Sequence, residues 1–142
     1  MKKSGKILGV LLVVCMVITM NVVSAYADSS VPVTRWDNYA ATKFAGGTGT
    51  KDDPYRIENG EQLAKLAKDV SAGNTHKGEY FRLEKNVDLS AHRWIPIGDY
   101  GGISYKHFEG FLDGNCKTIS GMVVDQSKDK QSAGLFGYIF NE

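Results

Sequence analysis

Glycine breaks the apolar stretch of residues 108–137 into pieces that are too short for helices. Two runs rich in Phe, Ile, Leu and Val, residues 108–124 and 134–139, are separated by a polar segment. The runs are broken by Gly110, Gly114, Gly121 and Gly137, and Gly134 begins the second run. Glycine is costly inside a helix, whereas short β-rich pieces between glycine turns are typical of strands. The stretch therefore predicts a mainly β fold built from short strands.

A weak repeat suggests how these strands are arranged. The pair Gly110-Phe111 returns as Gly134-Leu135, at a separation that suits one coil of a solenoid, whose repeats are about 20–45 residues long. A solenoid made of such coils would stack its strands in parallel along one axis.

Several segments resemble bacterial surface proteins that carry the GLUG motif. The likeness lies in GFLDGNCKTISG followed by GLFG, and the literal motif is Gly134, Leu135, Phe136 and Gly137. The segments FAGGTGTKDDPYRI, YFRLEKNVDLS and WIPIG extend the likeness over roughly residues 44–139. The resemblance implies the start of a right-handed parallel β-helix, here a domain of residues 44–142. Because no polar capping element follows residue 139, we expect this domain to be truncated.

The first 27 residues have the pattern of an export signal. A basic start with Lys2, Lys3 and Lys6 precedes an apolar run, and Ala25 and Ala27 form an A-x-A cleavage site. A retained membrane anchor is the alternative, but the apolar run is short for a membrane span. We therefore expect residues 1–27 to be cleaved, which would place the mature chain outside the cell with no membrane span.

Charge and cysteine content narrow the function further. The formal net charge of the whole chain is +1, and removal of the signal would take away lysines but no acidic residue. A near-neutral chain without a basic run argues against nucleic acid as a partner. Only Cys116 would remain after cleavage, so no intramolecular disulfide is expected. We expect Cys116 to be a small buried residue in a strand rather than a reactive thiol.

Residues 59–72 predict an amphipathic helix. Asn59 is a good N-cap, and Gln62 stands where a capping box needs it. One apolar face is formed by Leu63, Leu66, Ala67 and Val70. A β-helix has unpaired strand edges at its end, so we expect this helix to cap the N-terminal end of the solenoid. A helix that binds a partner protein is the alternative.

The remaining segments predict strands and loops. Residues 28–43 are expected to be a flexible lead-in, although Trp36 and Tyr39 could dock onto the domain or form an aromatic ligand platform. Strands are predicted at residues 55–57, 79–83 and 86–89, with an edge segment at 94–98. Residues 99–106 are expected to form an exposed loop. Three side chains of the second half are expected to point inward, namely Ile119, Met122 and Val124.

No catalytic motif is recognisable. The three histidines, His76, His92 and His107, form no H-E-x-x-H motif and are expected in loops or at the surface. The glycine-rich loop after Phe44 lacks the Lys-Ser/Thr pair that a phosphate-binding P-loop requires. Three carboxylates near strand ends could align for acid–base chemistry or calcium binding, namely Asp88, Asp113 and Asp125. The alternative, which we favour, is that they stabilise turns. No cofactor or catalytic residue is therefore expected.

These features predict a secreted or cell-surface structural or adhesive module of a bacterium, without enzymatic activity. A host or matrix protein or a glycan is the expected partner. One alternative is a fragment of a carbohydrate-active β-helix enzyme. Another is the non-catalytic front end of a large secreted peptidase or adhesin.

Overall fold

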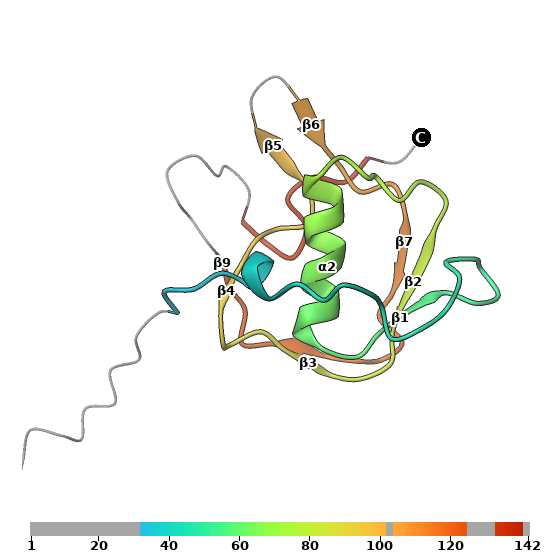
Figure 1. The fold of residues 1–142 in the computed structure, drawn as a ribbon, viewed down its shortest axis with the longest axis horizontal. Helices are drawn as coiled ribbons and strands as arrows, with labels where there is room; N and C mark the ends of the chain where they lie inside the picture. The colour runs from blue at the N-terminus through green and yellow to red at the C-terminus, as the bar shows by residue number, and fades with distance from the viewer. Residues whose placement is uncertain (1–31, 102–103, 125–132, 141–142) are drawn as a thin grey trace, which may run out of the picture. The chain divides into compact units, whose positions relative to one another are not determined.

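A computed structural model of the chain describes residues 32–101, 104–124 and 133–140 (Figure 1). All of them lie in one unit, Val31–Glu142. The predicted signal peptide, with its cleavage residues Ala25 and Ala27, lies outside the described residues, and so does Asp125.

The described residues form one α-helix, one 3₁₀ helix and nine short strands. In chain order these are η1 (Trp36–Tyr39), β1 (Tyr55–Ile57), α2 (Gly60–Ser71), β2 (Tyr80–Leu83), β3 (Val87–Asp88), β4 (Arg93–Trp94), β5 (Asp99–Gly101), β6 (Ser104–Lys106), β7 (Phe111–Asp113), β8 (Ile119–Ser120) and β9 (Val123–Val124). The predicted strand at residues 55–57 is confirmed. The strands predicted at 79–83 and 86–89 are present with shorter bounds.

Most strand pairs are parallel and join segments that are distant in the sequence. One sheet has the order β1-β2-β7, with Phe81 opposite Leu112. Two further pairs are β3-β8 and β4-β9. Figure 1 shows these three groups on different sides of α2.

The prediction of a right-handed parallel β-helix is wrong. The parallel sheets contain only two or three strands each, and the described residues form neither a solenoid nor a closed β-helix. The supposed repeat would place the Gly134-Leu135 segment beside β7; instead β7 pairs with β2, and Phe136 of that segment lies opposite Ile97. The glycine-broken apolar pattern specifies short strands, but it does not specify how many of them stack.

The helix prediction is confirmed, and its capping is visible in atomic detail. Asn59 Oδ1 accepts a hydrogen bond from the Gln62 backbone N–H at 3.0 Å. Gln62 Oε1 in turn accepts from the backbone N–H of Glu58 at 2.7 Å, one residue before the position expected of a capping box. Two backbone donors at the start of α2 are thereby satisfied.

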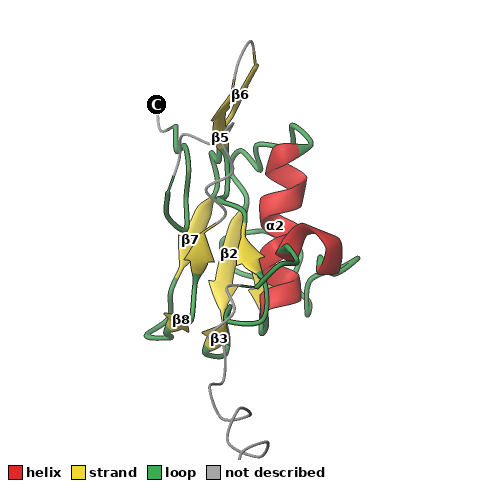
Figure 2. Cartoon of the chain, turned by 90° about the vertical axis from the view of Figure 1, so that its left-hand side faces the viewer, coloured by secondary structure: helices red, strands yellow, loops and turns green. Residues whose placement is uncertain are grey.

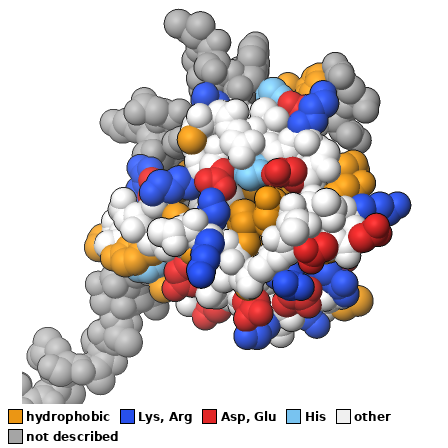
Figure 3. Space-filling model, turned by 45° about the vertical axis from the view of Figure 1, so that its right-hand side comes forward, with side chains coloured by type: hydrophobic (Ala, Val, Ile, Leu, Met, Phe, Trp, Pro, Cys, Tyr) orange, Lys and Arg blue, Asp and Glu red, His pale blue; other side chains and the backbone are white. Residues whose placement is uncertain are grey.

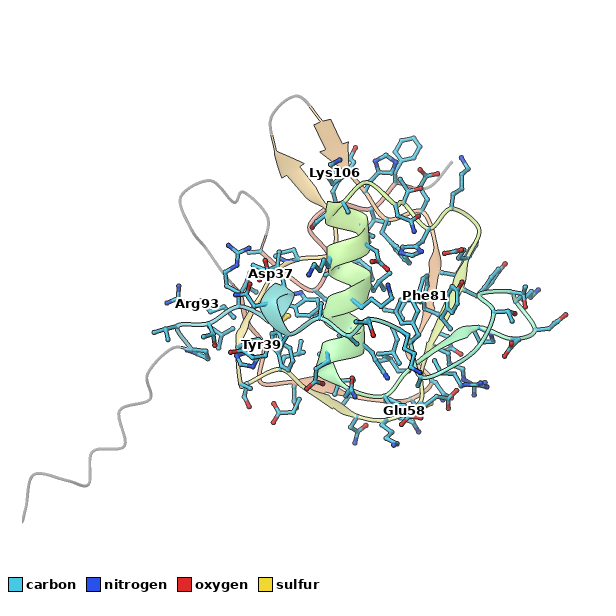
Figure 4. The ribbon with its side chains drawn as sticks, in the orientation of Figure 1. Asp37, Tyr39, Glu58, Phe81, Arg93 and Lys106 are labelled. Carbon is cyan, nitrogen blue, oxygen red and sulfur yellow. The ribbon has the colours of Figure 1, made fainter. Side chains whose placement is uncertain are left out.

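The apolar face of α2 is part of the core rather than a lid over the end of a solenoid. All four predicted residues, Leu63, Leu66, Ala67 and Val70, are buried. They share one cluster with strand residues such as Phe81, which points from β2 toward α2 in Figure 4. Figure 2 shows α2 beside the strands, with β2 nearer to it than β7. The predicted cap role is therefore corrected along with the fold that it assumed.

The lead-in is anchored at Trp36. This side chain is 4% exposed, and its Nε1 donates to the carbonyl of Leu89 at 3.0 Å. The Trp36 ring lies against Gly60, where a Cβ would come within 2.4 Å of it. Tyr39 stacks on His92 with ring centroids 3.9 Å apart. Of the two roles considered for Trp36 and Tyr39, the structure shows their docking onto the domain.

The predicted loop at residues 99–106 contains two short strands, β5 and β6. Strands β5 and β6 pair antiparallel, with Asp99 opposite Lys106 and Gly101 opposite Ser104. The sequence interpretation gave more weight to the glycine content of this segment, which is typical of loops.

Cys116 and Met122 also differ from expectation. Cys116 is exposed and has a φ of 53°, next to Asn115 at 45°, so it lies in a turn and not in a strand. Met122 is 37% exposed, while Ile119 and Val124 are half-buried. Strands β8 and β9 each pair with a single neighbour, so these side chains are only partly covered.

Candidate functional site

The candidate carboxylates serve their own turns. Asp88 Oδ1 accepts from the backbone N–H of Ser90 at 2.9 Å, and Asp113 Oδ1 accepts from that of Asn115 at 2.8 Å. The Ser90 backbone N–H and, to a lesser extent, its hydroxyl hold the pKa of Asp88 below its usual value. The structural interpretation of these two residues therefore accounts for their contacts.

Strand register keeps the same two carboxylates apart. Asp88 lies opposite Ser120, and Asp113 lies opposite Arg82. No carboxylate is thus stacked on another at either position. Within the described ranges, no group of three or more His, Cys, Asp and Glu side chains has a geometry that could hold a metal ion.

The sequence predicted the three histidines in loops or at the surface; all three lie outside helices and strands, but none is fully exposed. His76 is buried, while His92 and His107 are partly buried. His107 Nε2 lies 2.8 Å from Glu109 Oε1, and Lys77 Nζ lies 3.1 Å from the other oxygen of that carboxylate. Hydrogen bonds from Lys77 and His107 hold the pKa of Glu109 below its usual value.

The Gly134–Gly137 motif lies against the segment that contains Ile97. The Leu135 carbonyl accepts from the Ile97 N–H at 2.9 Å and from Trp94 Nε1 at 3.1 Å. Gly137 N–H donates back to the Ile97 carbonyl at 2.9 Å. The Phe136 ring stacks on Phe108 with centroids 5.6 Å apart. These contacts are structural, because they tie the motif to the core.

The outer surface of β2 and β7 carries an exposed aromatic stack. Alternation along the strands turns Phe81 and Leu83 inward, so Tyr80 and Arg82 face outward. The register places Phe111 beside Tyr80, and the two rings stack with centroids 4.5 Å apart and planes 13° apart. Phe111 is 49% exposed, so the stacked pair is open to solvent on one side.

Charged groups surround this stack. Asp113 Oδ2 lies 3.7 Å from Arg82 Nε on the same outward surface. The guanidinium is oriented by Asn115, whose Oδ1 accepts from Arg82 Nη2 at 3.0 Å. Lys51 and Asp52 complete a hollow of about 290 Å³ beside the rings. We call this surface, made by Tyr80, Arg82, Phe111 and Asp113 with Lys51 and Asp52, the Phe111 face.

The sequence interpretation missed the Phe111 face because its members are distant in the chain. Tyr80 and Phe111 were both placed in strands, but nothing local shows that these strands are neighbours. The one available signal was that both occupy outward positions of alternating segments. Such a signal identifies a surface residue and not its partner.

Among the comparisons with known proteins, only the comparison with curated protein sequences found relatives. No protein-family model matches the chain, and no solved structure matches it. The chain is 35% identical over 102 residues to a protein named as a Gly-rich membrane protein from Evansella cellulosilytica, covering 68% of this chain and 11% of the relative. It is 32% identical over 112 residues to halomucin from Haloquadratum walsbyi, covering 73% of this chain and 1% of the relative.

The chain thus spans about a tenth or less of the curated relatives that it matches. The similarities indicate a surface- or membrane-associated protein and are consistent with a cell-surface location. Neither name states a ligand or a reaction. Of the helices in the described part of the chain, none is both long enough and apolar enough to cross a membrane.

Proposed function

We propose that the chain is a non-catalytic, adhesive module of an exported cell-surface protein, and that it binds a glycan through the Phe111 face. The export signal and the likeness to GLUG-motif surface proteins belong to this proposal. The two curated relatives support its coarse part, a location at the cell surface or membrane.

The observation that carries the proposal is the stacked, half-exposed pair of Tyr80 and Phe111. A sugar ring presents an apolar face of C–H groups and an edge of hydroxyl groups. An aromatic ring offers a large, rigid apolar surface on which the C–H face of the sugar can pack at little cost in conformational entropy. The charged groups of Arg82 and Asp113 stand beside the rings and can donate to and accept from hydroxyl groups. Sites with an apolar surface and a few fixed polar groups are typical of small-ligand recognition.

Binding is favoured over catalysis by the way in which the carboxylates are used. Glycosidases need two carboxyl groups facing one bond, at about 5–9.5 Å from each other. Asp113 is engaged with the Asn115 N–H, and its cross-strand neighbour is an arginine. Asp52 lines the same hollow, but the engagement of Asp113 with its turn and with Arg82 supports recognition of a sugar rather than its cleavage.

The test is a glycan array probed with the purified full chain, with a panel of matrix proteins examined in parallel. Phe111→Ser should weaken binding to the glycan about threefold to tenfold, the value of one aromatic contact. Phe140→Ser is the matched control, because Phe140 is 39% exposed and lies outside the face; it should bind like the wild type.

Two results would overturn the glycan proposal. One is a folded chain that binds no glycan on the array. The other is a glycan whose affinity is the same for the wild type and for Phe111→Ser. Binding to a matrix protein that depends on Phe111 would also replace the glycan, while keeping the adhesive role.

A further inference from the structure

A second hollow lies on another face of the molecule, between α2, the start of β1 and the loop that precedes β2. Its volume is about 360 Å³, and its main side chains are Phe44, Tyr55, Lys65, Asp69, His76 and Glu79. We call it the His76 groove. Figure 3 shows an apolar hollow on this face, bordered by histidine, acidic and basic side chains. It shares no residue with the Phe111 face.

A buried histidine with a carboxylate beside each ring nitrogen lies at the groove. The His76 side chain is 4% exposed, and its Nδ1 lies 2.5 Å from Glu79 Oε2. Among the described residues, its Nε2 has no hydrogen-bond partner. Asp69 Oδ2 lies 3.5 Å from Nε2. Buried polar atoms are nearly always hydrogen-bonded, so a nitrogen left without a partner needs an explanation.

Hydrogen-bond chemistry indicates what is missing. A carboxylate can only accept, so His76 Nδ1 carries the proton that it donates to Glu79. In this tautomer Nε2 is an acceptor, and it faces a second acceptor, the carboxylate of Asp69. Two acceptors this close to each other are satisfied by one group that carries several hydrogens.

Lys65 shows which kind of group fits. Its Nζ donates to Asp69 Oδ2 at 2.8 Å and lies 5.1 Å from the centroid of the Phe44 ring. The groove thus already holds one ammonium group between a carboxylate and an aromatic ring. Phe44 and Tyr55, with ring centroids 5.0 Å apart, provide an apolar surface for the stem of such a group.

We propose that the His76 groove is a binding site for a primary ammonium group carried on an apolar stem. The ammonium group displaces Lys65, donates to Asp69 and to His76 Nε2, and the stem lies on Phe44 and Tyr55. His76 is preorganised for this role, because Asn74 Oδ1 accepts from its backbone N–H at 3.1 Å and Glu79 fixes its ring. The ligand is a lysine side chain of a partner or a free alkylamine.

The experiment is a titration of the full chain with n-butylammonium, followed by the ¹⁵N signals of the His76 ring. A saturable shift of Nε2 is expected. Tetramethylammonium has the same charge but no N–H group, and it should leave Nε2 unchanged. Equal responses to both cations, which would indicate general attraction to the acidic groups, would overturn the proposal.

Substitution of Lys65, which occupies the proposed site, gives the most discriminating experiment. Lys65→Met removes the ammonium group that competes for the site and should tighten n-butylammonium binding about threefold to tenfold. This factor corresponds to the free energy of the two Lys65 contacts that are lost, with Asp69 and with the Phe44 ring. Lys68→Met is the matched control, because Lys68 is on the same helix but lines the hollow beside Trp36; its affinity should stay at the wild-type value. Asp69→Asn should weaken binding in the Lys65→Met background.

The source of the ammonium group is read from a second probe. If Nα-acetyl-lysine N-methylamide binds more tightly than n-butylammonium, the ligand is a lysine side chain of a partner. If the two affinities are equal, a free alkylamine is sufficient to fill the site. The absence of any Nε2 response in both the wild type and Lys65→Met would overturn the proposal. Because the Phe111 face is elsewhere, the glycan assay is unaffected by either result.

Discussion

The contact between Gly60 and Trp36 makes an unusual prediction about helix stability. Gly60 is the first residue of α2, where replacement of glycine by alanine normally stabilises a helix by up to about 1 kcal/mol. Here an added Cβ would lie 2.4 Å from Trp36 Cη2 and 2.8 Å from its Cζ2. The ring cannot easily move away, because it is buried and its Nε1 is bound to the Leu89 carbonyl.

The magnitude follows from these opposing effects. Overpacking a buried site costs about 1–3 kcal/mol, which exceeds the gain in helix propensity. Gly60→Ala should therefore destabilise the chain by about 1–2 kcal/mol. The measurement is urea unfolding followed by far-UV circular dichroism, with an unchanged m-value. Gly114→Ala is the control, because no atom lies within 4 Å of its added Cβ, and it should change stability by less than about 0.5 kcal/mol.

A double-mutant cycle separates the clash from other effects of the alanine. In a Trp36→Leu background the ring is gone, and Gly60→Ala should become neutral or stabilising. An equal cost in both backgrounds, or a Gly60→Ala variant as stable as the wild type, would refute the idea that Trp36 packs on the start of α2.

Three further predictions follow from the described contacts. Leu66→Asp places a charge in the buried face of α2 and should lower the free energy of unfolding by at least about 3 kcal/mol; an unchanged thermal midpoint would show that this face is not in the core. Cys116 is exposed, so native-state thiol labelling should be as fast as in urea, whereas protection would contradict its place in the turn. The depressed pKa of Asp88 means that its contribution to stability is present above the unfolded pKa and is lost as the pH falls through the folded one. In a ¹³C titration, Ser90→Ala should raise this pKa part of the way to its usual value, and no change would exclude the hydroxyl as a cause.

Helix α2 and strand β1 were predicted correctly from the sequence. The helix was predicted because its signals lie within one segment, an Asn–Gln capping pair followed by an apolar stripe. Strand β1 was predicted to the residue, because the Asp53-Pro54 turn marks its start. Both cases depend on interactions between residues that are close in the chain.

Apart from the local pairing of β5 with β6, the errors concern interactions between distant residues. Short parallel pairs and a solenoid have the same glycine-broken pattern, so the β-helix prediction could not be tested locally. His76 carries an ordinary loop sequence, yet Asp69 and Glu79 enclose it. Cys116 lies within an apolar run, yet the turn that starts at Asp113 turns it outward. The Phe111 face depends on a register that no single segment encodes.

The most direct test of the adhesive role is to locate the bound ligand on the protein. The glycan that binds most strongly on the array would be titrated into the full chain while backbone amide signals are followed by NMR. Shifts concentrated at Tyr80–Leu83 and Phe111–Asp113, and absent in Phe111→Ser, are the predicted result. Shifts confined to other segments, or a chain that binds none of the glycans, would contradict the proposed function.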